Sequence, residues 1–94
     1  MRFEWDQGKN NDNLKRHQVS FEEAIEAFGD ANRVLHVDSK HSSESEKRYF
    51  LFGLLRGRVL TVRFTVRDQE VVRIIGAGFW RKGRKIYESE QDTK

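Results

Sequence analysis

The sequence predicts an α+β fold in which N-terminal helices pack on an antiparallel sheet of about four strands, followed by a short basic helix. Three observations predict it. Capped segments with helical spacing occur only before residue 30, apolar residues alternate with period two from about residue 33 to 77, and a Gly-containing turn separates two apolar runs. The length of 94 residues fits a single domain, 1–94, with one compact core.

Two helices are expected in the first third of the chain. The first covers residues 6–17, capped by its first residue, with Leu14 as its only apolar anchor. The second follows Ser20, which together with Glu23 has the spacing of a capping box ahead of an apolar helical pattern. Gly29 is expected to end this helix by adopting the left-handed conformation.

Alternating apolar residues then predict the strands of the sheet. The expected strands are residues 33–37, 47–55, 59–66 and 71–77, with a polar loop at 40–46. A two-residue turn at Arg56 and Gly57 would pair positions whose numbers sum to 113, so that Leu51 faces Val62.

The register of the last two strands bears on function. Matching their apolar faces puts Val62 beside Ile74, and this register places Arg63 beside Arg73 on the other face. Like charges on adjacent strands destabilise a sheet unless an anion or an acid neutralises them. Two explanations therefore stay open: a bound phosphate, or a carboxylate from a neighbouring element.

The chain is expected to end in a helix over about residues 80–89, with residues 89–94 as a frayed tail. Trp80, Arg84 and Tyr87 align on this helix. Gly83 lies in its interior, where glycine costs about 1 kcal/mol relative to alanine, so the helix is expected to dock on the sheet.

Composition and charge exclude some classes of function and favour others. The chain has no cysteine, which removes disulfides, thiolate nucleophiles and cysteine-bound zinc. It has no apolar run long enough to cross a bilayer and no signal-peptide pattern at its start, so we expect a cytoplasmic protein with no membrane partner.

Residues 56–85 carry nine basic residues against two acids, whereas residues 20–46 carry seven acids against two basic residues. The basic half favours a phosphate polymer as ligand, and a solvated charged face is the alternative.

The histidines allow two further hypotheses. His36, Asp38 and His41 form a conceivable metal cluster, but their spacing matches no recurrent ligand pattern, so we expect neither a metal nor another cofactor. His17 ends the predicted first helix. There it either stabilises the helix dipole or acts as a general acid or base.

Four sequence segments resemble the BrnT family of bacterial toxins. They are "FEWD" at 3–6, "NLKRHQVSFEEA" at 13–24, "RIIGA" at 73–77 and "RKGRKIYE" at 81–88, with Lys9 between the first two. The resemblance implies a RelE-like fold and a ribonuclease toxin that cuts RNA without a metal. It also implies a BrnA-like ribbon-helix-helix antitoxin encoded in the same operon, with operator DNA bound only through that antitoxin.

One segment departs from the family pattern. Gly76 replaces a serine of the usual R-I-I-S-A-R, and Gly78 stands where its last arginine would be. Phe79 and Trp80 then replace smaller or charged residues. A cationic group near the sheet edge is therefore missing, and Arg81 is the candidate to replace it. A weaker nuclease is the other expectation.

Metal-free RNA cleavage requires a base for the 2′-hydroxyl, cations for the phosphate and an acid for the leaving oxygen. Arginine suits the second task because its guanidinium binds two phosphate oxygens at once. The predicted catalytic residues are Arg63, Arg73, His17, Arg84 and Tyr87. The predicted RNA-binding residues are Lys9, Asn13, Lys15, Arg16, Arg81, Lys82 and Lys85. His17, Lys9 and Tyr87 remain alternatives for the proton transfers.

Two alternative functions stay open. One is a nucleic-acid-binding module without activity, and the other is a module that only titrates an antitoxin.

Overall fold

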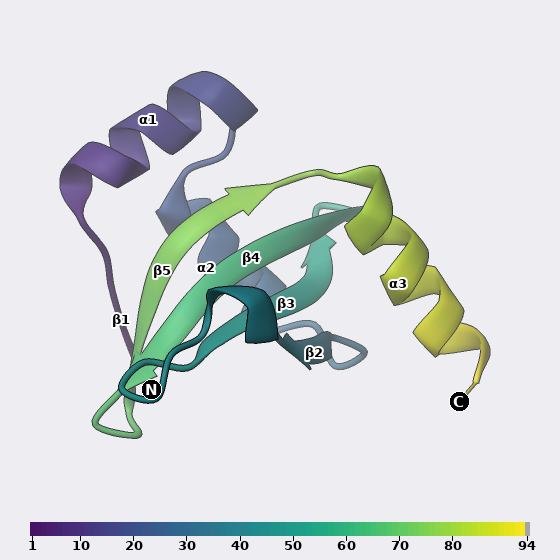
Figure 1. Cartoon of the computed structure of the whole chain (residues 1–94). Helices are drawn as coiled ribbons and strands as arrows, with labels where there is room; N and C mark the ends of the chain where they lie inside the picture. Colours follow the sequence, from purple (N-terminus) through teal and green to yellow (C-terminus); the bar gives the residue numbers. More distant parts are fainter. Residues whose placement is uncertain (94) are drawn as a thin grey trace.

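The computed structural model describes residues 1–93, and Figure 1 shows how their helices and strands are arranged. In chain order the elements are β1 Arg2–Glu4, α1 Gln7–His17, α2 Phe21–Phe28, β2 Val34–Val37, a 3-10 helix Ser39–His41, β3 Arg48–Leu55, β4 Arg58–Arg67, β5 Val71–Gly78 and α3 Arg81–Asp92. No helix of these residues is long and apolar enough to cross a membrane.

The strands form one five-stranded sheet in the order β1-β5-β4-β3-β2. Strand β1 runs parallel to β5, and the other neighbours are antiparallel. The α+β class is confirmed, but the sheet is mixed and has one strand more than predicted. The additional strand, β1, is only three residues long, too short for an alternating pattern to be recognised.

The main core lies between α2 and one face of the sheet, where Figure 1 shows α2 behind the strands. Phe21, Ala24 and Ala27 are fully buried there against Leu60 and Val62 of β4. On the opposite face, α3 covers part of β3 and β4 through a second, smaller cluster. That cluster contains Val34, Phe52 and Tyr87. The rest of this second face is free to form a site.

The predicted bounds of α1 are confirmed, and the Asp6 side chain accepts a hydrogen bond from the Lys9 amide at 3.0 Å. The predicted anchor is wrong, because Leu14 is 49% exposed. The buried residues of α1 are instead Asn10 and Asn13. Polar contacts therefore hold this helix on the fold.

The capping box of Ser20 and Glu23 at the start of α2 is confirmed by both of its hydrogen bonds. The predicted end geometry is wrong. Gly29 has a φ of −85°, in the right-handed region, and its amide donates to the Glu26 carbonyl at 3.0 Å. The helix ends by tightening its last turn and does not need the freedom of a glycine there.

The β3–β4 register is confirmed. Leu51 lies opposite Val62, and the turn residues Arg56 and Gly57 have φ values of 51° and 84°. Positive φ at both central residues matches the twist of a tight hairpin.

The predicted β4–β5 register is wrong. Arg63 lies opposite Gly76, Arg73 lies opposite Thr65, and the register shifts between Arg63 and Phe64. The shift is visible in the burial pattern, because Ile74 is 1% exposed and Ala77 is fully buried although the two are three positions apart. A bulge adds one residue to one strand of a pair and resets the alternation.

Helix α3 continues to Asp92, past the predicted end at residue 89. Gln91 donates from its side chain to the Asn32 carbonyl at 2.9 Å, so this end of the helix is attached to the loop before β2. Lys94, the last residue of the predicted tail, lies outside the described residues.

Candidate nucleic-acid interface

Asn13 fixes α1 against the outer edge of β5. Strand β1 pairs with β5 only as far as Glu4 and Arg73, which leaves the later part of that edge without a partner strand. The Asn13 side-chain amide binds this edge where a partner strand would pair. Its Nδ2 donates to the Ala77 carbonyl at 2.9 Å, and its Oδ1 accepts from the Ala77 amide at 3.2 Å. A third hydrogen bond, from Nδ2 to the Val19 carbonyl at 2.9 Å, ties in the loop before α2.

This attachment creates a cleft between α1 and the open face of the sheet, which we call the α1 cleft. Its volume is about 280 Å³, and its walls are Lys9, Asp12, Asn13, Arg16, His17, Arg63, Ile75, Gly76 and Trp80. Lys9, Asp12 and Arg16 are spaced so that they project from one side of the helix. Arg63 reaches the cleft from β4 opposite Gly76, where the missing side chain leaves space.

Two further hollows continue from the α1 cleft. One, of about 220 Å³, is lined by Arg16, His17, Gln18, Arg58, Phe79 and Trp80. The next, of about 340 Å³, is lined by Gly57, Arg58, Val59, Phe79, Trp80, Arg81, Arg84 and Glu88. Because neighbouring hollows share Trp80 and at least one basic residue, we treat them as one surface and call it the basic track.

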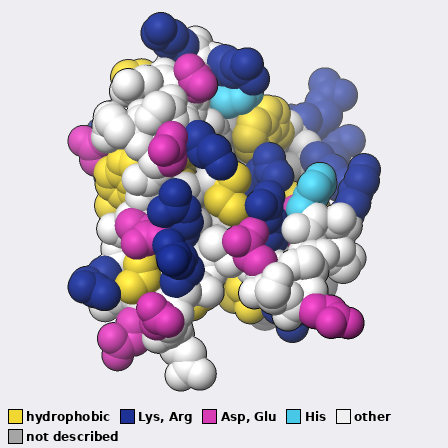
Figure 2. All heavy atoms as spheres, turned by 60° about the vertical axis from the view of Figure 1, so that its left-hand side comes forward, with side chains coloured by type: hydrophobic (Ala, Val, Ile, Leu, Met, Phe, Trp, Pro, Cys, Tyr) yellow, Lys and Arg dark blue, Asp and Glu magenta, His cyan; other side chains and the backbone are white. Residues whose placement is uncertain are grey.

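The basic track carries charge that is available to a ligand. Its cations are Lys9, Arg16, Arg58, Arg63, Arg81 and Arg84. None of them takes part in the ion pairs found among residues 1–93. Figure 2, turned to bring the α1 side forward, shows Lys and Arg side chains spread over this face with acidic side chains between them. The track is therefore positive locally, within a surface of mixed charge.

Arg58 lies at the centre of the track and was not among the predicted site residues. Its guanidinium carbon is 4.0 Å from the centre of the Phe79 ring, a cation–π contact that holds it over the hollow. Asp12 and Trp80 were also missed. Arg58 belongs to the basic half of the sequence, and Trp80 is an aromatic residue beside a run of cations, whereas Asp12 had no signal.

Arg73 does not line the basic track. Its Nη1 lies 2.9 Å from Oε2 of Glu4 on β1, and Arg67 binds the same oxygen at 3.0 Å. The hydrogen bond from Arg73 lowers the pKa of Glu4 below its ordinary value. Of the two explanations left open by the sequence, the carboxylate from a neighbouring element is the one found for Arg73.

Tyr87 also lies away from the track, in the cluster beneath α3. The residue is 7% exposed, and its hydroxyl donates to Oδ2 of Asp30 at 2.6 Å. Burial, strengthened by the Asp30 carboxylate, raises the pKa of Tyr87 to about 12. A phenol held in this way keeps its proton at neutral pH and connects α3 to the loop after α2.

The remaining predicted residues divide as follows. Arg81 and Arg84 line the track, whereas Lys82 borders a separate groove with Phe50 and Phe52. Lys15 and Lys85 are exposed and line none of these hollows. The structure thus brings together residues from α1, β4 and α3 that are far apart in the sequence.

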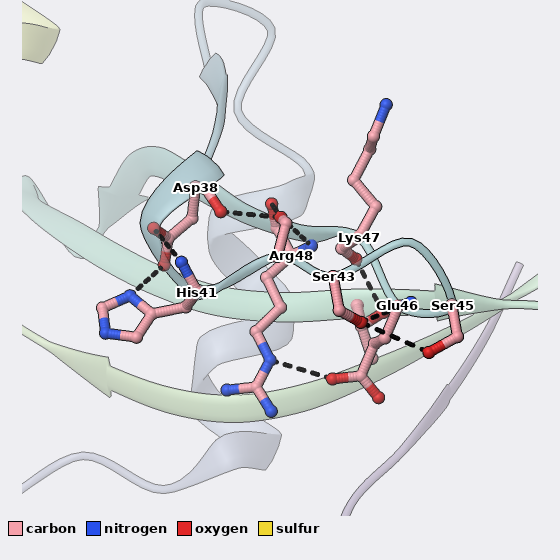
Figure 3. A network of polar contacts seen from close by, with 9 residues as sticks. Asp38, His41, Ser43, Ser45, Glu46, Lys47 and Arg48 are labelled. Carbon is pink, nitrogen blue, oxygen red and sulfur yellow. Dashed lines mark hydrogen bonds and ion pairs between the residues drawn. The ribbon is translucent and has the colours of Figure 1, made fainter.

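The residues of the conceivable metal cluster organise a loop. Figure 3 shows the His41 ring turned toward Asp38, with Nδ1 at 2.9 Å from Oδ2. In the same loop Nε of Arg48 donates to Glu46 at 2.9 Å. The His36 ring lies edge-on to Phe52, 5.5 Å between centres. Within residues 1–93, no three His, Asp or Glu side chains gather in a way that could hold a metal ion.

Comparisons with known proteins identify the family and the fold. The profile of the family described as "Ribonuclease toxin, BrnT, of type II toxin-antitoxin system" matches residues 5–83. The crystal structure of the Brucella abortus ribonuclease toxin BrnT has the same fold, with a TM-score of 0.61 and 21% sequence identity over 83% of this chain and 94% of that one. No curated protein matches the sequence. Because the profile covers most of the chain, the protein belongs to the BrnT family of ribonuclease toxins of type II toxin-antitoxin systems.

Proposed function

We propose that this protein is a metal-independent endoribonuclease toxin whose active site is the α1 cleft. The observation that carries the proposal is that Arg63 faces Lys9, Arg16 and His17 across one cleft, with no acid paired to it among the described residues. The family's description as a ribonuclease toxin supports the reaction. The RelE-like assignment of the fold is part of the same proposal.

In the proposed reaction the RNA supplies its own nucleophile. The 2′-oxygen loses its proton and attacks the adjacent phosphorus, the bond to the 5′-oxygen breaks, and that oxygen takes up a proton. The products are a 2′,3′-cyclic phosphate and a 5′-hydroxyl. Arg63 stabilises the extra negative charge on the pentavalent phosphate, because its guanidinium donates to two oxygens at once.

The other residues of the α1 cleft complete the chemistry. Arg16 and Lys9 bind the phosphates on either side of the reacting one. His17 and Asp12 line the same cleft and are the groups that exchange protons with the 2′- and 5′-oxygens. Arg84 and Arg81 bind the strand as it continues along the basic track.

Two predicted catalytic residues have other roles in this proposal. Arg73 is bound to Glu4, so we assign it to holding β1 on the sheet. Tyr87 is bound to Asp30, so we assign it to positioning α3. The structure supports Arg63 as the main stabilising group in place of Arg73.

The test is RNA cleavage in excess chelator by the purified protein and three variants. Arg63→Ala should lower kcat by roughly 10²–10³-fold, the loss typical of deleting one preorganised donor to a developing charge. Arg63→Lys should recover only part of it, because lysine keeps the charge but loses the two-point geometry. Arg67→Ala, on the same strand but outside the track, is the matched control and should cleave like the parent.

Two results would contradict the proposal. One is loss of activity when metal is removed, and the other is unchanged cleavage by Arg63→Ala. Binding of RNA without any cleavage would instead favour the second candidate function, a nucleic-acid-binding module without catalysis. The observation that favours this second function is Gly78 at the position of a family arginine.

We further propose that a BrnA-like ribbon-helix-helix antitoxin neutralises the toxin by covering the basic track, and that operator DNA is bound only through the antitoxin. An acidic or amphipathic segment would compete with RNA, because one set of arginines cannot bind two polyanions at once. Titration of labelled RNA with and without the antitoxin measures this. Simultaneous binding with undiminished RNA affinity would exclude the competitive mechanism.

A further inference from the structure

Trp80 is the one residue that borders every hollow of the basic track among the residues described. It is 38% exposed, although tryptophan is usually more deeply covered. The other tryptophan, Trp5, packs against the main core with its ring edge-on to Phe21. Trp80 also borders the groove that contains Phe50 and Phe52, so it is exposed on the surface where this groove meets the track and is not part of the main core.

Gly78 determines how the indole lies. A Cβ at Gly78 would fall 2.7 Å from both Cε2 and Cη2 of Trp80, and closer still to Cζ2 between them. A point nearly equidistant from three consecutive ring atoms lies above the ring and not beyond its edge. One face of the indole therefore rests on the Gly78 backbone, and 38% of the residue stays exposed. Any side chain at position 78 would displace it.

The surroundings of Trp80 match those of a platform for a nucleic-acid base. The His17 ring stands edge-on to the indole, 5.2 Å between centres, and helps to fix its orientation. Arg63 and Arg16 line the α1 cleft together with the indole, and Arg58 lines with it the two hollows that continue toward α3. A strand whose phosphates follow these cations would bring a base to the indole. Aromatic side chains stack on any base, because every base has a π face.

We propose that Trp80 stacks on an unpaired base of the RNA and that Gly78 provides the space in which the indole lies. This inference rests on the proposed function and specifies its substrate class as single-stranded RNA. Bases of a duplex are stacked on one another and are not available to the indole.

The test measures binding separately from cleavage. A labelled single-stranded RNA with 2′-O-methyl groups cannot be cleaved through the 2′-oxygen, and its affinity is followed by fluorescence anisotropy. Trp80→Leu should lower this affinity by about 5- to 150-fold, the range found when a stacking aromatic side chain is removed. Trp80→Phe should lose less, because it keeps an aromatic face. Both variants should bind inorganic polyphosphate, which has no bases, like the parent.

A second variant tests the geometry without changing polarity. Gly78→Ala should weaken binding of the same RNA in the parent, since the new methyl group displaces the indole. In the Trp80→Leu background the same change should have little effect. The Gly78 and Trp80 effects are therefore expected to be non-additive. Circular dichroism of each variant checks that it is folded.

The outcomes separate this inference from the proposed function. Equal RNA affinity of the folded Trp80→Leu variant and the parent would overturn the stacking role alone. Additive effects of the two substitutions would overturn the role of Gly78. Equal loss of polyphosphate and RNA binding in Trp80→Leu would show that the indole supports the cations and does not contact a base. If the unmutated protein cleaves RNA but binds duplex RNA as tightly as single-stranded RNA, single-stranded RNA is not its substrate class. If the unmutated protein binds no RNA, both proposals are overturned.

Discussion

Buried amides attach α1 to the rest of the molecule at the level of single side chains. Oδ1 of Asn10 accepts from the Phe21 amide at 2.8 Å, and Nδ2 of Asn10 donates to Glu22 at 3.2 Å. Asn13 binds both backbone groups of Ala77 and the Val19 carbonyl. Since α1 supplies one wall of the α1 cleft, these amides position the proposed active site.

Asn13→Ala should lower the free energy of unfolding by roughly 1–3 kcal/mol, because it leaves buried backbone groups without partners. Asn11→Ala is the matched control on the same helix. Asn11 is exposed, and its side chain accepts a hydrogen bond from the exposed Gln7 side chain at 3.2 Å, so its replacement should be nearly neutral. Urea unfolding of the two variants gives the comparison. Equal stabilities would mean that the Asn13 amide does not hold α1.

Asn13 also illustrates what the sequence could not predict. It stands in a motif of the family, and a polar residue on a helix with few apolar residues was assigned to RNA binding. Its burial follows from the length of β1, which leaves part of the β5 edge unpaired. That edge exists only in the folded sheet. A backbone-binding role of this kind therefore has no local pattern.

Tyr87 predicts a pH dependence of stability. Its pKa is raised from 10.0 to about 12, so the unfolded chain loses the phenolic proton first as the pH rises. The stabilisation is therefore fully present below pH 10 and is lost as the pH approaches 12. Tyr87→Phe should lack this loss and should be less stable than the parent at neutral pH by about 1.5–3 kcal/mol, the value of a hydrogen bond to a charged group.

Thermal unfolding of the parent and Tyr87→Phe at several pH values between 8 and 12 tests this. The difference between the two proteins should shrink with increasing pH. Because the hydroxyl does not line the basic track, the folded variant should cleave RNA like the parent. A specific loss of cleavage in Tyr87→Phe would restore the residue to the catalytic set.

At the level of secondary structure, the two hairpins show why one register was predictable and the other was not. The β3–β4 turn contains Gly57, which favours a positive φ and marks a tight turn in the sequence. The β4–β5 turn places Asp68 and Gln69 at φ values of 54° and 62°, where non-glycine residues are uncommon. The bulge then changes the pairing of β5 with β4 along the rest of the hairpin. Neither feature has a clear sequence signal, so the pairing of Arg63 with Arg73 was inferred wrongly.

Gly83 allows α3 to pack closely on the sheet, although glycine weakens the helix itself. From the sequence, this glycine weakens the helix in isolation, and the helix was therefore expected to dock on the sheet. In the structure a Cβ at Gly83 would meet Oγ1 of Thr61 and the Phe52 ring, the latter at 3.0 Å. Gly83→Ala should therefore destabilise the protein although alanine favours helix, because overpacking typically costs 1–3 kcal/mol against a helix gain of about 1 kcal/mol.

Denaturant unfolding of Gly83→Ala checks the sign of this effect. Ser89→Ala, an exposed site on the same helix, is the control and should be neutral or slightly stabilising. A Gly83→Ala protein more stable than the parent would mean that α3 does not approach the sheet this closely.

At the level of the whole molecule, the basic track combines residues of α1 with residues of β4 and α3. The sequence predicted a basic half at residues 56–85, but Arg56, Arg67 and Arg73 of that half are bound to glutamates. Lys9 and Arg16 come from α1 instead. Composition thus predicts a polyanionic ligand. Which cations meet it depends on ion pairs across the sheet and on the docking of α1, and these are tertiary features.

The track also predicts how RNA binding responds to salt. Each phosphate neutralised by the protein releases counterions, so the logarithm of the RNA affinity should fall linearly with the logarithm of salt concentration, with a slope of about −0.7 per phosphate contacted on a single strand. Arg58 is central to the track, so Arg58→Ala should reduce the magnitude of this slope by about 0.7. Arg67→Ala removes the same formal charge outside the track and should leave the slope unchanged. Glu4 keeps a partner in this variant, because Arg73 still binds it.

Anisotropy titrations of the 2′-O-methyl RNA at several salt concentrations measure both slopes. Equal slopes for the parent and Arg58→Ala would place the RNA backbone outside the hollow that joins α1 to α3, and equal reductions in both variants would mean that net charge and not the track governs binding.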